Sequence, residues 1–316
     1  MTVRSKKIMA ILKLLYIGVC KENLEKYYPS YIRGEFLKDI YTEDELVAMV
    51  IRKNINVLMV DVFSTTFTVS LLQRLKGHIK LINCLYQSID SLIDLKDADS
   101  CGIEVRKLPD DIYCNEVAEF AVTQLLCACK NTIQFNKSVK NGEWNQAVST
   151  NLSIKGKTLG VVGFGNIGKC IIKLCENWGM NILVTRKHLN KCQYIPNVTF
   201  VDFSNLIENS NYIIFAVPLK KDTFQMFNKK HIEKLRRNSI IVNISRGNVV
   251  DENAVHEALR LGKLYKYCAD VFSQEPINTD HMFINSNETI LSPHVAWATE
   301  DTLKKSFAVW FNQTTI

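Results

Sequence analysis

The sequence lacks a long apolar run, because no segment of its 316 residues reaches the ~18–20 uninterrupted apolar residues of a membrane-spanning helix. The nearest candidate is Ile8–Val19, which follows basic residues and imitates a signal peptide. Lys13 interrupts this run, and Leu14–Gly18 also fits a first β-strand, which is the interpretation we favour. We therefore expect no membrane association.

Disulfide and metal patterns are also absent, although the chain has ten cysteines. No two cysteines form a Cys-x-x-Cys pair, and none has a zinc-ligand spacing to a histidine. Cys127 and Cys129 lie in an apolar helical pattern, as core residues do. A chain of this size with so complete a core needs no disulfide framework, so we expect no metal and a reducing cytoplasm.

A basic patch for nucleic acid is missing as well. The net charge is +7, but Lys and Arg are spread through the chain and usually stand near Asp or Glu. A content of 47% hydrophobic and 22% charged residues is typical of a globular protein long enough for two domains. We expect no nucleic-acid partner, and a mild attraction for an anionic cofactor and substrate.

What the sequence does contain is a dinucleotide fingerprint. The apolar run Leu159–Val162 leads directly into Gly163-x-Gly165-x-x-Gly168, and a helical pattern follows. In such a turn the first glycine permits the tight bend, the second admits a pyrophosphate, and the third lets the helix pack on the strand. The phosphates would bind free N–H groups at the start of the helix.

Short apolar runs alternate with helical patterns on both sides of this fingerprint, which predicts parallel sheets. The predicted strands are Leu14–Gly18, Val57–Val60, Lys80–Cys84, Ile103–Val105, Leu159–Val162, Ile182–Thr185, Tyr212–Ala216, Ile240–Asn243 and Lys266–Asp270. The predicted helices include Thr42–Lys53, Thr68–Leu75, Asn115–Phe135 and Leu303–Phe311. Asn115–Phe135 has almost no polar face, so we expect it to be buried on both sides, within its domain or against a partner chain.

Three later motifs point to one family. They are Ile241–Glu252, Asp270–Pro276 and Leu291–Ala296. Together with the glycine turn they closely resemble the D-isomer-specific 2-hydroxyacid dehydrogenases, in particular the glyoxylate and hydroxypyruvate reductases. The resemblance covers about residues 80–300 and is weaker before them.

The resemblance implies an α/β protein with two Rossmann-like domains. A flavodoxin-like substrate domain, residues 1–113 plus 292–316, would carry an inserted NAD(P)-binding Rossmann domain, residues 114–291. Members of the family commonly form two-fold dimers through the region of Asn115–Phe135, so we expect a homodimer with an isologous interface.

The chemistry of 2-keto acid reduction accounts for three residues of these motifs. Arg246 offers a bidentate fork for the substrate carboxylate and carbonyl. His294, a side chain that titrates near neutrality, can act as the general acid, and Glu275 can hold the imidazole and stabilise its protonated form. The family assigns the same roles at these motif positions.

The cofactor is expected to be NADP(H), with NAD(H) still usable. Arg186 and Lys187 stand where an NAD enzyme usually has an acidic residue for the adenosine ribose, and two cations suit a 2′-phosphate. By family analogy Asp270 meets the nicotinamide amide. The expected cofactor contacts are Gly163, Gly165, Asn166, Ile167, Gly168, Arg186, Lys187, Val217, Pro218, Thr223, Ile244 and Asp270.

The substrate loop departs from the family pattern. That loop is usually glycine-rich, but Leu85–Asp90 has Ser88 in place of the glycine and Gln87 in place of a small residue. Trp297 either narrows the pocket or packs. We expect substrate contacts from Gln87, Ser88, Arg246 and Trp297, and the identity of the keto acid stays open between glyoxylate and hydroxypyruvate.

Two alternatives stay open. One is a D-3-phosphoglycerate dehydrogenase. Arg186 argues against this alternative, because those enzymes use NAD. The sequence given also ends at Ile316, without the regulatory domain that some of them append. The other is a non-enzymatic dinucleotide sensor, like the corepressor branch of the family, which keeps the same three residues.

Overall fold

The computed structural model describes residues 13–18, 26–27, 34–37, 41–61, 66–87, 89, 92–147, 150–188 and 194–314. The chain divides into two compact units. The first comprises the residues up to Ile112 together with those from Thr299 onward, and the second runs from Tyr113 to Ala298.

The second boundary lies later than the expected division at 291/292. The segment that follows this position donates three hydrogen bonds to the carboxylate of Asp270, from the Ser292 hydroxyl and from the backbone N–H groups of Val295 and Ala296. These bonds keep residues 292–298 with the second unit.

The first unit is a five-stranded parallel sheet with the strand order β2-β1-β3-β4-β5. This is the flavodoxin-like order, so the predicted fold class of this unit is confirmed. Its elements are β1 (Leu14–Gly18), β2 (Gly34–Leu37), α2 (Glu43–Lys53), β3 (Val57–Asp61), α3 (Val69–Leu75), β4 (Leu81–Cys84), α4 (Leu95–Ser100), β5 (Glu104–Arg106) and α11 (Glu300–Asn312).

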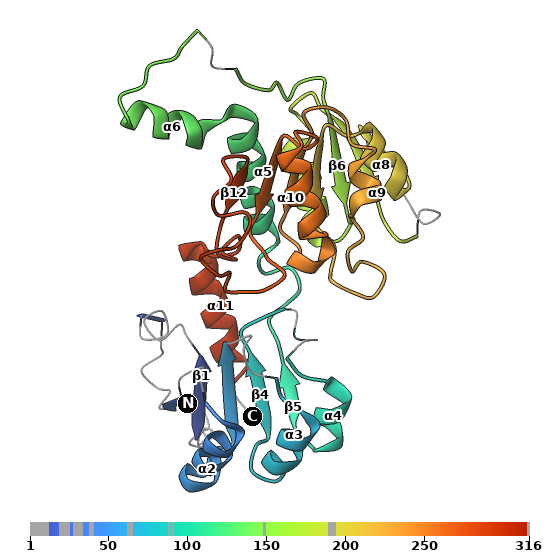
Figure 1. The fold of residues 1–316 in the computed structure, drawn as a ribbon. Helices are drawn as coiled ribbons and strands as arrows, with labels where there is room; N and C mark the ends of the chain where they lie inside the picture. Colours follow the sequence, from blue (N-terminus) through green and yellow to red (C-terminus); the bar gives the residue numbers. More distant parts are fainter. Residues whose placement is uncertain are drawn as a thin grey trace, which may run out of the picture. The chain divides into compact units, whose positions relative to one another are not determined.

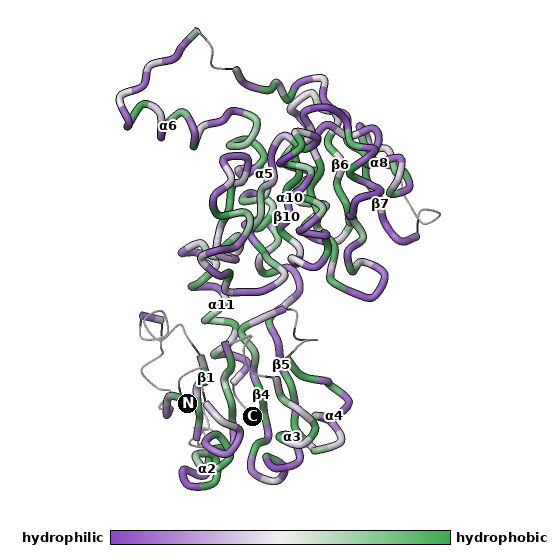
Figure 2. The backbone as a smooth tube through the Cα atoms, in the orientation of Figure 1, coloured by the Kyte–Doolittle hydropathy of each residue, from purple (hydrophilic) through white to green (hydrophobic). Residues whose placement is uncertain are grey.

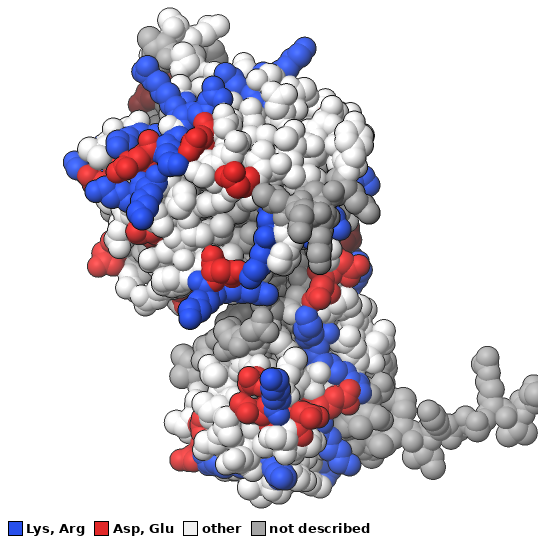
Figure 3. All heavy atoms as spheres, turned by 90° about the vertical axis from the view of Figure 1, so that its right-hand side faces the viewer, with Lys and Arg blue, Asp and Glu red and all other residues white. Residues whose placement is uncertain are grey.

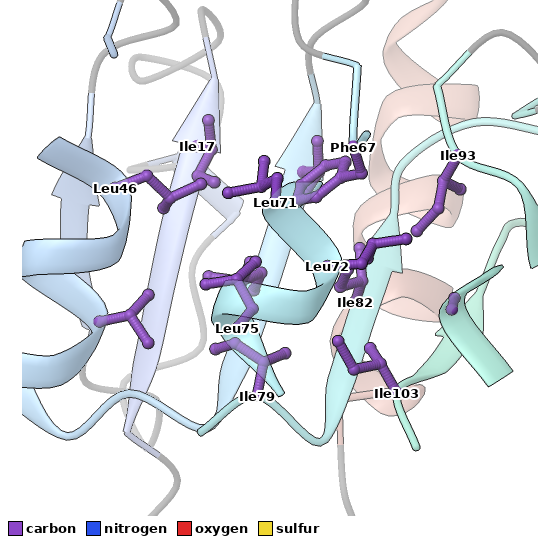
Figure 4. Close-up of a cluster of buried hydrophobic side chains, with 14 of the residues drawn as sticks. Ile17, Leu46, Phe67, Leu71, Leu72, Leu75, Ile79, Ile82, Ile93 and Ile103 are labelled. Atoms are coloured by element: carbon purple, nitrogen blue, oxygen red, sulfur yellow. The ribbon is translucent and has the colours of Figure 1, made fainter. Parts of the chain in front are cut away.

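The core of this unit lies between the sheet and the helices α2 and α3. Figure 4 shows the side chains of Leu46, Leu71 and Leu75 directed at those of the strands, among them Ile17 and Ile82. Helix α2 starts at the predicted capping box, in which Thr42 and Glu45 satisfy each other's backbone N–H groups.

Helix α11 belongs to the first unit although it comes from the end of the chain. Its Trp310 is fully buried, and the indole N–H donates a hydrogen bond of 2.9 Å to the carbonyl of Asn83 in β4. The Asn83 side chain donates one of 2.8 Å back to the Trp310 carbonyl. This reciprocal pair joins two segments that are 227 positions apart in the sequence.

The second unit is a seven-stranded parallel sheet with the order β12-β11-β10-β9-β6-β7-β8. This is the order of a dinucleotide-binding Rossmann fold, as predicted. Its elements are α5 (Cys114–Lys130), α6 (Thr132–Lys140), β6 (Thr158–Val162), α7 (Asn166–Cys175), β7 (Asn181–Thr185), β8 (Val198–Phe200), α8 (Phe203–Asn209), β9 (Tyr212–Phe215), α9 (Lys229–Ile232), β10 (Ile240–Asn243), the 3-10 turn η2 (Gly247–Val249), α10 (Glu252–Arg260), β11 (Lys266–Ala269) and β12 (Thr289–Leu291).

The single helix predicted over Asn115–Phe135 is wrong in one respect, because it is two helices. Asn131 adopts a left-handed conformation with φ of 47°, which asparagine tolerates, and so ends α5 and begins α6. Helix α5 packs against α7, β10 and β11, but a face with Asn115, Glu119 and Thr123 is exposed, so within its own unit it is buried on one side only. Helix α6 has no buried residue and projects from the sheet (Figure 1).

Hydropathy and charge follow this architecture. The strands are hydrophobic and the outer loops mostly hydrophilic (Figure 2). Lys and Arg are interspersed with Asp and Glu on the face shown in Figure 3. None of the helices that the structure describes is both long and apolar enough to cross a membrane. Eight of the ten cysteines fall among the described residues, and all eight are free thiols.

Candidate active site and dinucleotide site

The predicted site residues of the second unit follow the carboxyl ends of its parallel strands. The glycine turn follows β6, Arg186 follows β7, and Ile244 follows β10. The strand order reverses between β6 and β9, and ligands of such sheets bind outside the carboxyl ends at this switch point. The fold therefore gathers residues from distant parts of the sequence at one edge.

The glycine turn has the steric properties that the fingerprint predicts. Gly163 has φ of +111°, and a Cβ there would lie 2.4 Å from the carbonyl oxygen of Ala216. A Cβ on Gly168 would lie 2.1 Å from the carbonyl oxygen of Gly163, so only glycine lets α7 approach the strand this closely. Larger residues are excluded at both positions.

Gly165 differs from Gly163 and Gly168, the other two glycines of this turn. A Cβ at this position would meet no atom within 4 Å, so its small size leaves open space. Gly165 is also the N-cap of α7 and provides no side-chain acceptor for the first-turn N–H groups. Open space at an uncapped helix N-terminus fits the pyrophosphate of a dinucleotide.

The two cations after β7 have different surroundings. Lys187 forms an ion pair of 2.6 Å with Asp222, and this hydrogen-bonded ammonium holds the pKa of the Asp222 carboxyl below its usual value. Arg186 instead lies with its guanidinium carbon 5.8 Å from the ring centroid of Phe164. Among the described residues no carboxylate lies within 4.0 Å of Arg186.

The segment after β9 is held by two hydroxyl groups. The backbone N–H of Val217 donates to the Ser245 hydroxyl at 3.1 Å, which ties this segment to the one after β10. The Thr223 hydroxyl donates to the carbonyl of Pro218 at 2.6 Å and closes the loop between them. Val217, Pro218 and Ile244 therefore lie at the same edge as the glycine turn.

Asp270 anchors the segment that carries His294. Its side chain is buried, and burial raises the pKa of this carboxyl, an effect that the Ser292 hydroxyl and two backbone N–H groups partly offset. The carbonyl of Asp270 accepts a further hydrogen bond of 2.8 Å from the His294 N–H. His294 adopts φ of 55°, an unfavourable backbone conformation, and these hydrogen bonds hold it in place.

The structure brings Arg246, Glu275 and His294 together. Nδ1 of His294 lies 2.7 Å from Oε2 of Glu275, and Oε1 of Glu275 accepts a bond of 2.8 Å from the N–H of Phe272. Burial alone would raise the pKa of Glu275, but His294, the Phe272 N–H and the charge of Arg246 hold it below its usual value. Burial lowers the pKa of Arg246, which Glu275 opposes.

Two further residues fix this arrangement, and the sequence did not identify their role. A Cβ on Gly247 would lie 1.8 Å from the carbonyl carbon of Phe272, so the backbones of two motifs are in direct contact. Buried Glu252 accepts bonds from both the N–H and the hydroxyl of Ser273. Their position inside the motifs was the only sequence signal.

The expected substrate residues are less completely placed. The Trp297 indole N–H donates to the His294 carbonyl at 3.2 Å, and its ring lies 5.3 Å from that of Tyr113, so this side chain packs. Gln87 belongs to the first unit, where its amide nitrogen is shielded from solvent without a hydrogen-bond partner among the described residues. Ser88 lies outside the described residues.

Comparison with known proteins now identifies the family. The model of the D-isomer specific 2-hydroxyacid dehydrogenase NAD binding domain matches residues 122–296. The chain belongs to this family. The Rossmann unit is thus its dinucleotide-binding domain, and the predicted family is confirmed.

Individual relatives agree with this assignment. The glyoxylate reductase of Thermococcus litoralis is 33% identical over 217 residues, which cover 66% of this chain and 65% of that protein. The match therefore spans slightly less than two thirds of the length of this relative. The D-3-phosphoglycerate dehydrogenase of Archaeoglobus fulgidus is 32% identical over 226 residues, which cover 71% of this chain and 42% of that protein.

Solved structures agree on the fold. The D-lactate dehydrogenase of Escherichia coli superimposes with a TM-score of 0.80 at 21% identity, covering 95% of each chain. At this identity the likeness concerns the two-unit architecture alone.

Proposed function

We propose that this protein reduces a small 2-keto acid, glyoxylate or hydroxypyruvate, to the corresponding D-2-hydroxy acid with NADPH as the preferred reductant. The observation that carries this proposal is the hydrogen bond of 2.7 Å between His294 and Glu275, beside Arg246 and on the sheet edge that holds the glycine turn. A carboxylate, an imidazole and a guanidinium are the groups that reduction of a keto acid requires.

In this mechanism the guanidinium of Arg246 binds the substrate carboxylate and orients the carbonyl. When bound, reduced nicotinamide would supply the hydride that the carbonyl carbon accepts. As the carbonyl electrons move onto oxygen, protonated His294 donates its Nε2 proton to that oxygen, because Nδ1 is engaged by Glu275. The imidazole becomes neutral and takes a new proton from solvent.

The cofactor would be held by the residues of the sheet edge. The turn from Gly163 to Gly168 and the start of α7 suit the pyrophosphate, and Asp270 lies on the nicotinamide side by family analogy. Arg186, which has no ion-pair partner among the described residues, supports NADPH because it stands where an acidic residue would favour NADH. NADH stays usable as the weaker ligand.

Substrate contacts outside this edge are proposed from the resemblance. Gln87 and Ser88 would contact the keto acid, and the unpaired amide nitrogen of Gln87 supports this for the first residue. The relatives include both glyoxylate reductases and a phosphoglycerate dehydrogenase, so phosphohydroxypyruvate is the competing substrate.

The test is oxidation of NADPH and NADH with glyoxylate, hydroxypyruvate, pyruvate and phosphohydroxypyruvate, with His294→Gln as the matched control. We expect the highest kcat/KM for NADPH with glyoxylate or hydroxypyruvate. Product chirality is read from hydroxypyruvate, because glycolate has no stereocentre. Dinucleotide binding without turnover of any acid would favour the sensor, and preferred use of phosphohydroxypyruvate would favour the phosphoglycerate enzyme.

A homodimer is part of the same proposal, with an interface through the region of Asn115–Phe135 that extends along α6. One face of α5 is exposed at Asn115, Glu119 and Thr123, and Ile133, Val139 and Trp144 on and after α6 are 53%, 55% and 78% exposed. A second copy that covers both projecting helices would bury these side chains in a two-fold interface. Sedimentation of the unmodified chain and of Trp144→Ser tests this, and a monomer at all concentrations would contradict it.

The compartment is proposed to be the reducing cytoplasm. Eight free thiols in the described part of the chain, most of them buried, suit such an environment. Mass spectrometry of the protein isolated under alkylating conditions should show all cysteines alkylated, which means that they were reduced.

A further inference from the structure

A pocket of about 420 Å³ lies beside the glycine turn. Its lining combines the Phe164 ring, the side chain after β7 and one face of α7, namely Phe164, Lys169, Ile172, Lys173, Glu176, Arg186 and Ile195. Three of these side chains are cations and one is an anion, so the lining has a formal charge of +2. The motifs assign no role to Lys169 or Lys173.

Two of the cations converge on one aromatic ring. The Lys169 ammonium lies 5.4 Å and the Arg186 guanidinium carbon 5.8 Å from the Phe164 ring centroid. Phe164 is itself held by an edge-to-face contact of 5.0 Å with Phe200 in β8. Cations at this distance are attracted by the ring, which positions them at the pocket. Neither has an ion-pair partner within 4.0 Å in the described ranges.

Lys187, the second cation of the expected pair, lies outside this arrangement. Its ammonium is 2.6 Å from Asp222 and does not line the pocket. Because Asp222 lies against it, the Lys187 ammonium is partly neutralised and attracts another anion less than an unpaired ammonium does. At the pocket, the cation that accompanies Arg186 is therefore Lys169 and not Lys187.

We propose that Lys169, together with Arg186, binds the 2′-phosphate of NADP(H) at the Phe164 ring, and that Lys187 does not. This inference rests on the NADPH preference proposed above. A phosphate monoester carries a charge of about −2 at neutral pH, which matches the lining. Lys169 lies three residues, or about 4.5 Å, along the axis from the first residue of α7, whereas Lys173 lies about 10 Å from it, farther from the glycine turn. Among the described residues, the cations that contact the Phe164 ring are Lys169 and Arg186.

The experiment measures dissociation constants of NADPH and NADH by titration calorimetry, without substrate or turnover. The variants are Lys169→Gln and the matched control Lys187→Gln, both on the surface, and thermal unfolding checks their fold. A charge-assisted hydrogen bond to phosphate corresponds to a tenfold or larger change, so Lys169→Gln should weaken NADPH binding about tenfold. NADH binding should stay within about twofold, and Lys187→Gln should change the ratio of the two constants less than about twofold.

The outcomes separate the two proposals. If unmodified protein prefers NADPH but Lys187→Gln reduces this preference as much as Lys169→Gln does, the inference is overturned and the proposed function stands. An equal loss of NADPH and NADH binding in Lys169→Gln also overturns it, because the lysine would then bind a group common to both. If the unmodified protein shows no NADPH preference, the cofactor part of the proposed function fails first.

Discussion

The two ends of the Rossmann sheet edge are built in different ways. At the His294 end, buried Asp270, buried Glu252 and the contact at Gly247 fix the backbone that carries the reacting groups. At the Phe164 end, the cations that surround the pocket sit on exposed or partly exposed side chains, and two of them, Lys169 and Arg186, contact the Phe164 ring.

This difference separates two physical requirements. Proton transfer needs atoms within hydrogen-bond distance of each other, so rigid backbone anchors support it. Recognition of a phosphate needs net charge near an open space, which flexible cations can provide. We therefore expect substitutions at the first end to change turnover and stability, and those at the second to change only affinity.

The largest effect is expected for His294→Gln. General acid catalysis typically contributes about 10²–10⁴-fold, and turnover should fall by this amount. The dissociation constant of NADPH should stay within about twofold, because the imidazole acts on the substrate side. Steady-state kinetics and calorimetry measure the two quantities, and an unchanged rate of keto acid reduction would show that the proton comes from another group.

The next substitution, Gly247→Ala, disturbs the close backbone contact at the His294 end. Its Cβ would overlap the backbone at Phe272 and Ser273, so the free energy of unfolding should fall by about 1–3 kcal/mol and turnover should fall with it. Urea denaturation measures the first quantity.

The matched control is Gly165→Ala, whose Cβ meets open space. Loss of a glycine N-cap should cost at most about 1 kcal/mol, while NADPH binding should weaken because the methyl group enters the pyrophosphate space. Equal destabilisation by both substitutions would show that the two glycines do not differ as described.

The Phe164 end is tested by Arg186→Asp. Removing a charge-assisted bond of about 1.5–3 kcal/mol and introducing a ribose acceptor should lower the NADPH preference roughly tenfold to a hundredfold or reverse it. Michaelis constants for both cofactors report this change. Turnover with the preferred cofactor at saturation should stay within about twofold, since the pocket does not contact the reacting groups.

The smallest effect on turnover is expected for Glu275→Gln. The Glu275 carboxylate lies 2.7 Å from Nδ1 of His294 and orients the imidazole, so its replacement by an amide should lower turnover less than His294→Gln does. Steady-state kinetics measures this, and a loss as large as that of His294→Gln would contradict the positioning role.

The same carboxylate affects stability with a defined sign. Because the pKa of Glu275 is lower in the folded protein, its stabilisation is present above the ordinary carboxyl pKa of about 4.3 and is lost as pH falls through the folded value. The difference in unfolding free energy between the unmodified protein and Glu275→Gln should therefore shrink from pH 7 to pH 3. A constant difference would contradict this linkage.

Local sequence patterns predicted most helices and strands of the two sheets correctly. The central strands are apolar and short, and the capping box at Thr42 gave the start of α2. The edge strands β2, β8 and β12 were missed, because strands of three or four residues at a sheet edge carry too few apolar positions. The break at Asn131 was missed because a single left-handed residue leaves an apolar pattern intact.

The sequence by itself determined which residue types stand at the ends of the strands, since a glycine turn and a short apolar run are recognisable over a few positions. Only the tertiary structure decided which of them act together. Lys187 pairs with Asp222 across 35 positions, and Lys169 joins Arg186 at one ring, because loops of different strands meet at the same sheet edge. The physical reason is that strand and turn preferences are local, whereas charge pairing and steric contact depend on distances in space.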